Sequence, residues 1–123
     1  MAINSAFEID LFGQVNAEMV GGRYLGAVGG QVDFMHAAST QQDGLSIIAM
    51  PSTTRDGNRS RIVARLNTSL ITTGKSDVDI VATEMGIADL RGKTITQRMQ
   101  ALRNVAAPQF RDEIDKLMPR TMP

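Results

Sequence analysis

Hydrophobic and polar residues alternate along several short stretches of the chain, which is the pattern of half-buried β-strands. The first stretch predicts a strand over residues 3–12, and residues 14–20 continue as a second extended or turning piece. Apolar runs bounded by turn residues predict further strands at 46–50 and 61–66. A last strand is expected to begin near Asp77 and to end at Thr83-Glu84.

Helical spacing of apolar residues appears after the glycine-rich segment 21–30 and twice in the last third of the chain. Thr94 and Gln97 have the spacing of a capping box. Pro108 suits the first residue of a second C-terminal helix. The sequence therefore predicts an α/β domain with a partly parallel sheet, helices packed on it and two C-terminal helices. The apolar positions that define the helices are Val32, Met35 and Ala38, then Ile95, Met99, Leu102 and Val105, and finally Phe110, Ile114 and Leu117.

Glu84 is the most informative candidate site residue, because it follows the strand that begins near Asp77. Ligands and catalytic groups gather at the carboxyl ends of strands in α/β proteins. We expect a short helical turn after Glu84 that ends at Gly92. A carboxylate at that position can also be an ordinary first-turn residue stabilised by the helix dipole.

Composition removes several classes of function. The 123 residues suffice for one domain with a modest core. Thirteen basic residues balance thirteen acidic ones, and no basic stripe suggests a nucleic-acid partner. The absence of cysteine and the single histidine, His36, disfavour thiolate or histidine metal sites and a serine triad. Without an apolar run of membrane-spanning length or the form of a signal peptide, we expect a cytoplasmic domain and no membrane contact.

A glycine-rich loop and an asparagine side chain are further candidates. The loop containing Gly29, Gly30 and Gln31 precedes the first expected helix, so its N–H groups can face a phosphate or a carboxylate. Glycine clusters also serve tight turns. The side-chain amide of Asn16 can donate to a developing oxyanion, although asparagine after a strand is also common turn chemistry.

Three other positions have both a functional and a structural interpretation. Asp56-Gly57 within the polar loop 52–60 is either a hairpin turn or part of a ligand loop. Arg59 and Arg61 can meet phosphate, or can simply be solvated. His36 fits a partly buried helix residue with a hydrogen-bonded ring.

Five blocks of the chain stand out together, in order and without large gaps. They are residues 3–16 (INSAFEIDLFGQVN), 29–34 (GGQVDF), 46–53 (SIIAMPST), 60–63 (SRIV) and 72–92 (TTGKSDVDIVATEMGIADLRG). Over residues 2 to about 112, the chain resembles the C-terminal domain of the acetyl-CoA hydrolase/transferase family, which includes 4-hydroxybutyrate CoA-transferases and succinyl-CoA:acetate CoA-transferases. The resemblance implies a CoA-transferase-like α/β fold of the NagB/RpiA/CoA-transferase type.

The resemblance implies a mechanism through a glutamyl-CoA thioester, with coenzyme A as a substrate and no metal or other cofactor. The attacking glutamate lies upstream of this domain in the family, so residues 1–123 are expected to lack it. Glu84 matches the glutamate of the family's Thr-Glu-x-Gly motif, which helps to place the nucleophile or the substrate carboxylate. Asn16 matches an asparagine that assists the thioester oxyanion. Gly29, Gly30, Gln31 and Gly57 match backbone around the acyl and CoA groups, whereas His36-Ala37 departs from the Arg-Gly of many relatives.

These residues leave three classes of function open. The chain is a part of a CoA-transferase or acyl-CoA hydrolase, an inactive fragment, or a small module that binds an anion or CoA. In the first case its partners are acyl-CoA, a small carboxylate, and either an N-terminal domain or a second copy of the chain. Because the chain opens inside an expected strand, we also predict exposed apolar surface on residues 3–11 or on that sheet face, filled by a partner.

Overall fold

Two β-sheets form the framework of the domain. The computed structural model describes residues 1–20, 23–24, 31–66 and 71–120. The larger sheet has the order β1-β6-β8-β9, in which the first three strands are parallel and β9 is antiparallel. The smaller sheet has the order β3-β2-β7, and β4 pairs with β5 beside it. Strand bounds are Ala2–Asn4 (β1), Glu8–Asp10 (β2), Val15–Asn16 (β3), Met19–Val20 (β4), Arg23–Tyr24 (β5), Ser46–Ala49 (β6), Ile62–Val63 (β7), Ile80–Thr83 (β8) and Gly86–Asp89 (β9).

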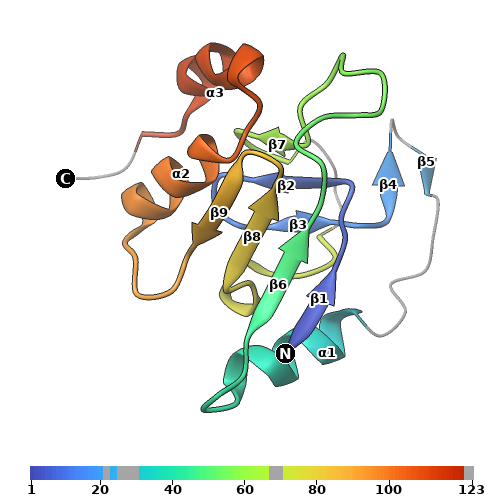
Figure 1. The fold of residues 1–123 in the computed structure, drawn as a ribbon, viewed down its shortest axis with the longest axis vertical. Coiled ribbons are helices and arrows are strands. Elements are labelled where there is room, and N and C mark those ends of the chain that lie inside the picture. The colour runs from blue at the N-terminus through green and yellow to red at the C-terminus, as the bar shows by residue number, and fades with distance from the viewer. Residues whose placement is uncertain (21–22, 25–30, 67–70, 121–123) are drawn as a thin grey trace.

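Helices flank the sheets, and the last two stand at the C-terminal end, as the sequence predicts (Figure 1). The capping box of α2 is confirmed, since the Thr94 hydroxyl accepts from the Gln97 N–H and the Gln97 side chain accepts from the Thr94 N–H. Pro108 opens a 3₁₀ turn that leads directly into α3. Helix bounds are Gln31–Thr40 (α1), Lys75–Asp77 (η1), Ile95–Asn104 (α2), Pro108–Phe110 (η2) and Arg111–Leu117 (α3).

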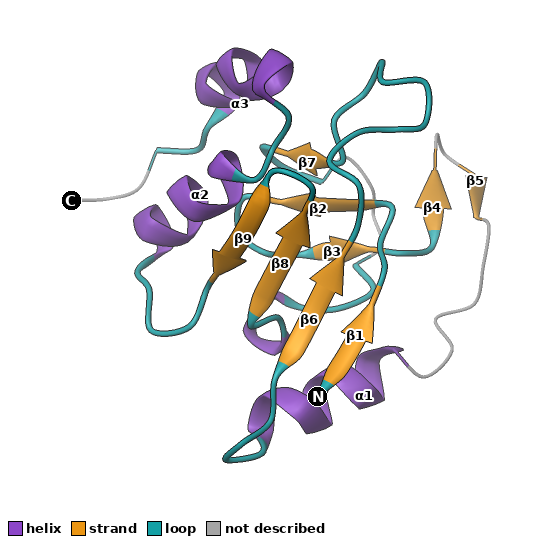
Figure 2. Ribbon diagram, viewed as in Figure 1, coloured by secondary structure: helices purple, strands orange, loops and turns teal. Residues whose placement is uncertain are grey.

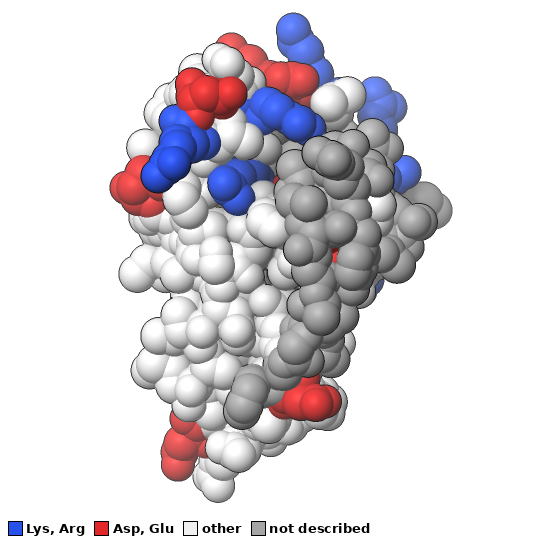
Figure 3. All heavy atoms as spheres, turned by 90° about the vertical axis from the view of Figure 1, so that its right-hand side faces the viewer, with Lys and Arg blue, Asp and Glu red and all other residues white. Residues whose placement is uncertain are grey.

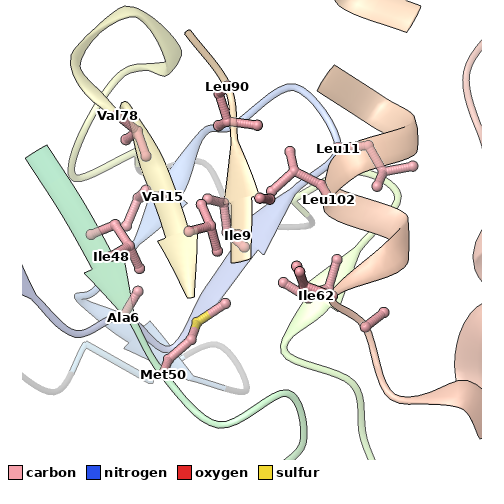
Figure 4. Close-up of a cluster of buried hydrophobic side chains, with 14 of the residues drawn as sticks. Ala6, Ile9, Leu11, Val15, Ile48, Met50, Ile62, Val78, Leu90 and Leu102 are labelled. Carbon is pink, nitrogen blue, oxygen red and sulfur yellow. The ribbon is translucent and has the colours of Figure 1, made fainter. Parts of the chain in front are cut away.

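The hydrophobic core lies between the two sheets, whose strands cross in Figure 2. Ile48 of the larger sheet and Ile9 of the smaller sheet are both fully buried in it. Figure 4 shows their side chains together with those of Val15 and Leu102. Helix α1 reaches the core through Met35, and α2 reaches it through Leu102.

The structure corrects the predicted strand over residues 3–12. Residues 2–4 pair in the larger sheet and residues 8–10 pair in the smaller one, so the chain changes layers in between. Both pieces have alternating residues, and for this reason the pattern alone did not separate them. The strand predicted at 61–66 is also shorter, although Ile62 and Ala64 are buried and Arg65 is exposed as its alternation requires.

The helical turn predicted between Glu84 and Gly92 is wrong. Residues 86–89 form β9, which pairs antiparallel with β8 around a two-residue turn at Glu84-Met85. Gly86 follows that turn with φ of +141°, a backbone conformation that favours glycine. Its partner in the hairpin is Thr83.

Candidate functional site

The carboxyl ends of the three parallel strands meet at one edge of the larger sheet. Ser5 follows β1, Pro51-Ser52 follows β6, and Glu84 follows β8. This confirms the predicted position of Glu84 at the carboxyl end of a strand. Polar groups from three separate parts of the sequence are therefore assembled at this edge.

Ser52 holds the Glu84 carboxylate. Its backbone N–H lies 3.1 Å from Oε1 and 3.0 Å from Oε2, and its hydroxyl also donates to Oε1. The hydroxyl, helped by the N–H, lowers the pKa of the Glu84 carboxyl below its ordinary value, while slight burial acts in the opposite direction. Because Ser52 is fully buried and Glu84 is exposed, a rigid donor fixes an ionised carboxylate at the surface.

Arg61 ties two strand ends together beside this pair. Its Nε donates to the Thr53 carbonyl at 3.0 Å, and Nη1 lies 3.4 Å from the carbonyls of both Ala6 and Phe7. The guanidinium thus connects the segment after β6 with the segment after β1. Because its Nε and Nη1 are directed at carbonyl oxygens, Arg61 stabilises the backbone at this edge and is not simply solvated.

Gln31 connects α1 to the same edge. Its side-chain nitrogen donates to the Ser5 carbonyl at 3.0 Å, and its oxygen accepts from the Thr73 hydroxyl at 2.9 Å. The first residue of α1 therefore lies beside the end of β1. Gly29 and Gly30 fall outside the described residues, so their predicted place around the acyl and CoA groups stays a prediction.

Asn16 is fully buried in the smaller sheet, where it organises a turn. Its side-chain oxygen accepts from the N–H groups of Glu18 and Met19, each at 3.0 Å. Its nitrogen donates to the Met19 carbonyl at 2.6 Å and lies 3.5 Å from Glu8 Oε1. This is the turn chemistry that the sequence left open, and donation to an oxyanion stays a prediction.

A chain of contacts leads from Asn16 to Glu84. The Asn16 carbonyl accepts from the Phe7 N–H at 2.8 Å, and the Phe7 carbonyl lies 3.4 Å from Arg61 Nη1. Arg61 binds the carbonyl of Thr53, the residue after Ser52. A series of hydrogen bonds thus connects the two predicted catalytic residues. That both face one cleft stays a prediction.

Gly57 lies at the tip of the loop that follows Ser52. It has φ of +76°, and its N–H donates to the Thr54 carbonyl at 2.9 Å. The Asp56 carboxylate accepts from the Thr54 hydroxyl and from the Asn58 N–H, which closes the turn. The hairpin turn is therefore confirmed, and the predicted place of Gly57 around the CoA group stays a prediction. Figure 3 shows Lys and Arg side chains gathered toward the end of the molecule where Figure 1 places the loop.

A cavity of about 230 Å³ lies between α3 and the smaller sheet. Ile62, Phe110 and Ile114 contribute apolar surface to it, while Glu8 and Arg59 contribute charged groups. Neither Glu84 nor Ser52 lines this cavity. Glu8 nonetheless brings its wall close to Asn16, through the 3.5 Å contact.

His36 lies on the exposed side of α1, contrary to a partly buried position. Its Nδ1 is 2.9 Å from the Asp77 carboxylate, which also accepts from the Ser39 hydroxyl at 3.3 Å. The imidazole side chain is 64% exposed. This contact joins α1 to η1 at the surface.

Sequence reasoning missed Ser52 as the partner of Glu84. The available signal was a polar residue directly after the apolar run 46–50 and Pro51, so that Ser52 follows β6 by three residues, while Glu84 directly follows β8. Two polar residues after neighbouring parallel strands meet at one edge, so the pairing was within reach once the two strands were taken as neighbours.

Comparison with known proteins identifies the family. The model of the acetyl-CoA hydrolase/transferase C-terminal domain matches residues 1–118. The 4-hydroxybutyrate coenzyme A transferase of Clostridium kluyveri is 45% identical over 115 residues, which are 93% of this chain and 27% of that protein. The chain thus spans about a quarter of the length of that relative.

Solved structures show the same relationship. RipA from Yersinia pestis matches with a TM-score of 0.84 and 39% identity, over 94% of this chain and 26% of its own. A 4-hydroxybutyrate CoA-transferase from Porphyromonas gingivalis matches with a TM-score of 0.73 and 42% identity, over 93% of this chain and 24% of its own. Among the described residues, no helix is long and apolar enough to cross a membrane. The predicted CoA-transferase-like fold is confirmed, and the chain belongs to the acetyl-CoA hydrolase/transferase family as its C-terminal domain.

Proposed function

We propose that this domain forms one wall of the active site of an acyl-CoA:carboxylate CoA-transferase of the 4-hydroxybutyrate or acetate type. One observation carries the proposal: Ser52 presents Glu84 as a fixed, ionised carboxylate at the open edge of the parallel strands. Coenzyme A is a substrate in this proposal, and neither a metal nor another cofactor takes part.

The reaction needs an attacking carboxylate, which the proposal assigns to polypeptide outside these 123 residues. That carboxylate displaces CoA thiolate from the acyl-CoA and forms a mixed anhydride. The thiolate then attacks the enzyme's glutamyl carbonyl, which releases the carboxylic acid anion and leaves a glutamyl-CoA thioester. The acceptor acid takes up CoA by the reverse steps, so transfer consumes no net proton or electron.

Glu84 has a positioning role in this scheme. An ionised carboxylate accepts hydrogen bonds and cannot donate them, so it orients donor groups of the substrate or of the facing wall. Its two oxygens are directed by one buried serine, which limits the positions that a bound donor can take. Such orientation lowers the barrier of a reaction whose reacting groups must meet at about 3 Å.

The test uses the complete enzyme that contains this domain. Glu84→Gln should lower turnover roughly 10²-fold or more, on the scale of a positioned charged group, because it removes the charge and keeps the shape. Asp112→Asn is the matched control, because this carboxylate is exposed on α3, and it should keep full turnover. Full activity in the Glu84→Gln enzyme would contradict the proposal.

Mass spectrometry separates positioning from attack. After incubation with acyl-CoA, the 123-residue chain should carry no CoA adduct and should catalyse no transfer to acetate. The complete Glu84→Gln enzyme should still form the glutamyl-CoA adduct, but slowly. A CoA thioester on Glu84 itself would make this residue the nucleophile.

Hydrolysis is the alternative outcome, and the description of the family includes it. The two reactions differ in whether water or an acid accepts the acyl group or CoA, which depends on how well the closed site excludes water. Product analysis with and without acetate distinguishes them: a hydrolase releases free CoA at the same rate in both conditions.

A further inference from the structure

The larger sheet has two faces of different character. In its strand register, Ile48, Val81 and Ala88 are partners across β6, β8 and β9, and all three are buried in the core. The neighbouring rows point to the opposite side, which we call the outer face. Its residues are Ile3, Ile47 and Ile80 in one row and Ala49, Ala82 and Ile87 in another.

The elements that cover this sheet lie on the inner face. Helix α1 contributes Met35 to the core that contains Ile48, and α2 contributes Leu102. The smaller sheet packs on the same side through Ile9. Among the described residues, no helix or strand crosses the outer face, and the strands of the larger sheet stand clear in Figure 2.

The outer face is apolar. Ile3 is 61% exposed and Ile87 is 72% exposed, at the two edge strands of the sheet. Ala49, between them, is also exposed. In the row of Ile87, the partners are uncharged. In the row of Ile3, the charged residue is Asp89, which is the partner of Ile80 at one corner of the sheet. An exposed apolar patch of this kind marks an interaction surface.

Strand β6 has the sequence of a strand that is buried on both sides. After the buried Ser46, Ile47 and Ala49 point outward, while Ile48 and the following Met50 point inward, so residues 47–50 are apolar on both faces. Parallel strands have this composition when both faces of the sheet are covered, whereas a half-covered sheet alternates apolar with polar residues. The sequence of β6 therefore favours a second covering layer.

We propose that the outer face is covered by an apolar surface of the polypeptide that precedes this domain in its relatives. The relative from Clostridium kluyveri is nearly four times as long as the matched region, and the matched domain is C-terminal, so the additional polypeptide leads toward β1. β1 is the edge strand beside the outer face. The inference rests on the proposed function, since it identifies the polypeptide that supplies the missing wall.

The geometry also connects the outer face to the site. Ile87 lies three residues beyond Glu84, on the strand that leaves the same turn. Met85, within the turn, is 42% exposed. A polypeptide seated on the outer face can therefore extend to the turn that carries the carboxylate and present its own groups to it.

Co-expression tests the interface. The chain is produced together with the remainder of the Clostridium kluyveri 4-hydroxybutyrate CoA-transferase, and the complex is measured by affinity purification and sedimentation. The wild-type chain should form a one-to-one complex. Ile87→Asp should weaken binding at least tenfold because it buries a charge in the interface, while Gln100→Asp on the exposed side of α2 should leave binding unchanged.

Each outcome decides the proposal. Thermal unfolding of the isolated Ile87→Asp chain should match that of wild type, which shows that the variant still folds. Equal binding of wild type and Ile87→Asp, or no complex with wild type, would overturn the proposal. Self-association of the chain that Ile87→Asp abolishes would assign the face to a second copy and also overturn it. If the complex depends on Ile87 but the Glu84→Gln enzyme keeps full activity, the interface is retained and the proposed function is rejected.

Discussion

Replacement of Ile48 by alanine gives a quantitative test of the two-faced sheet. Ile48 is fully buried on the inner face, and the substitution removes both γ carbons and the δ carbon. The lost transfer free energy is about 2.4 kcal/mol, at roughly 0.8 kcal/mol per buried carbon. The cavity between two crossing sheets adds to this, so we expect a total loss of about 3–4 kcal/mol.

Ile47 is the matched control, because it is the adjacent residue of the same strand and points to the outer face. Ile47→Ala is the same chemical change as Ile48→Ala in the same strand, so the comparison reports the difference between the two faces of the sheet. The side chain is only partly buried and its removal leaves no closed cavity. We expect a loss of about 1 kcal/mol in the isolated chain.

Urea unfolding of the isolated chain measures both losses. With a slope of roughly 1–3 kcal/mol per molar for a domain of this size, the two midpoints should differ by about 1 M. The slope itself should stay constant, so that the midpoint shift reports stability. An Ile47→Ala chain that is as unstable as the Ile48→Ala chain would refute the assignment of an open outer face.

Three further predictions concern single elements. Thr94→Ala should destabilise the domain by about 1 kcal/mol through loss of the α2 cap, and an unchanged urea midpoint would contradict it. Gly13→Ala should cost about 1–2 kcal/mol because Gly13 has φ of +87°, whereas Gly74→Ala, at φ of −71° and in open space, should be nearly neutral in the same assay. The Arg91 side chain lowers the pKa of Asp89 to about 2 from 3.8, so their ion pair should stabilise the fold above about pH 4 and lose this effect as the pH falls toward 2. Because both side chains are over a third exposed, the effect should stay below about 1 kcal/mol; an Asp89 carboxyl that titrates near 3.8 by NMR would show that the pair does not form in solution.

Local patterns predicted the elements whose stabilising contacts are close in sequence. The capping box at Thr94, the helix after residue 30 and the strand at 46–50 all follow from neighbouring residues, and the structure confirms each. The division of residues 3–12 between two sheets does not, because alternation is the same in either layer. The choice is made by the partners of each piece, β6 for one and β7 for the other, which lie far along the chain.

The hairpin after Glu84 was missed for a related reason. Residues 85–92 contain two glycines and an alternation too short to distinguish a turn of helix from a strand. Pairing with β8, whose register places Ile87 opposite Ala82, decides the matter. The position of Glu84 was nevertheless predicted, because it depends only on where β8 ends.

The contact between Ser52 and Glu84 has a consequence for the assembly of the sheet. The two residues follow separate strands, β6 and β8, whose parallel register places Ala49 opposite Ala82. A slip of one residue would displace Ser52 by about 3.3 Å along β6, beyond the reach of a hydrogen bond, and would exchange the inward and outward side chains of the strand. The carboxylate is therefore held only when β6 and β8 have paired correctly. Misregistered molecules would lose the ordered site together with the core.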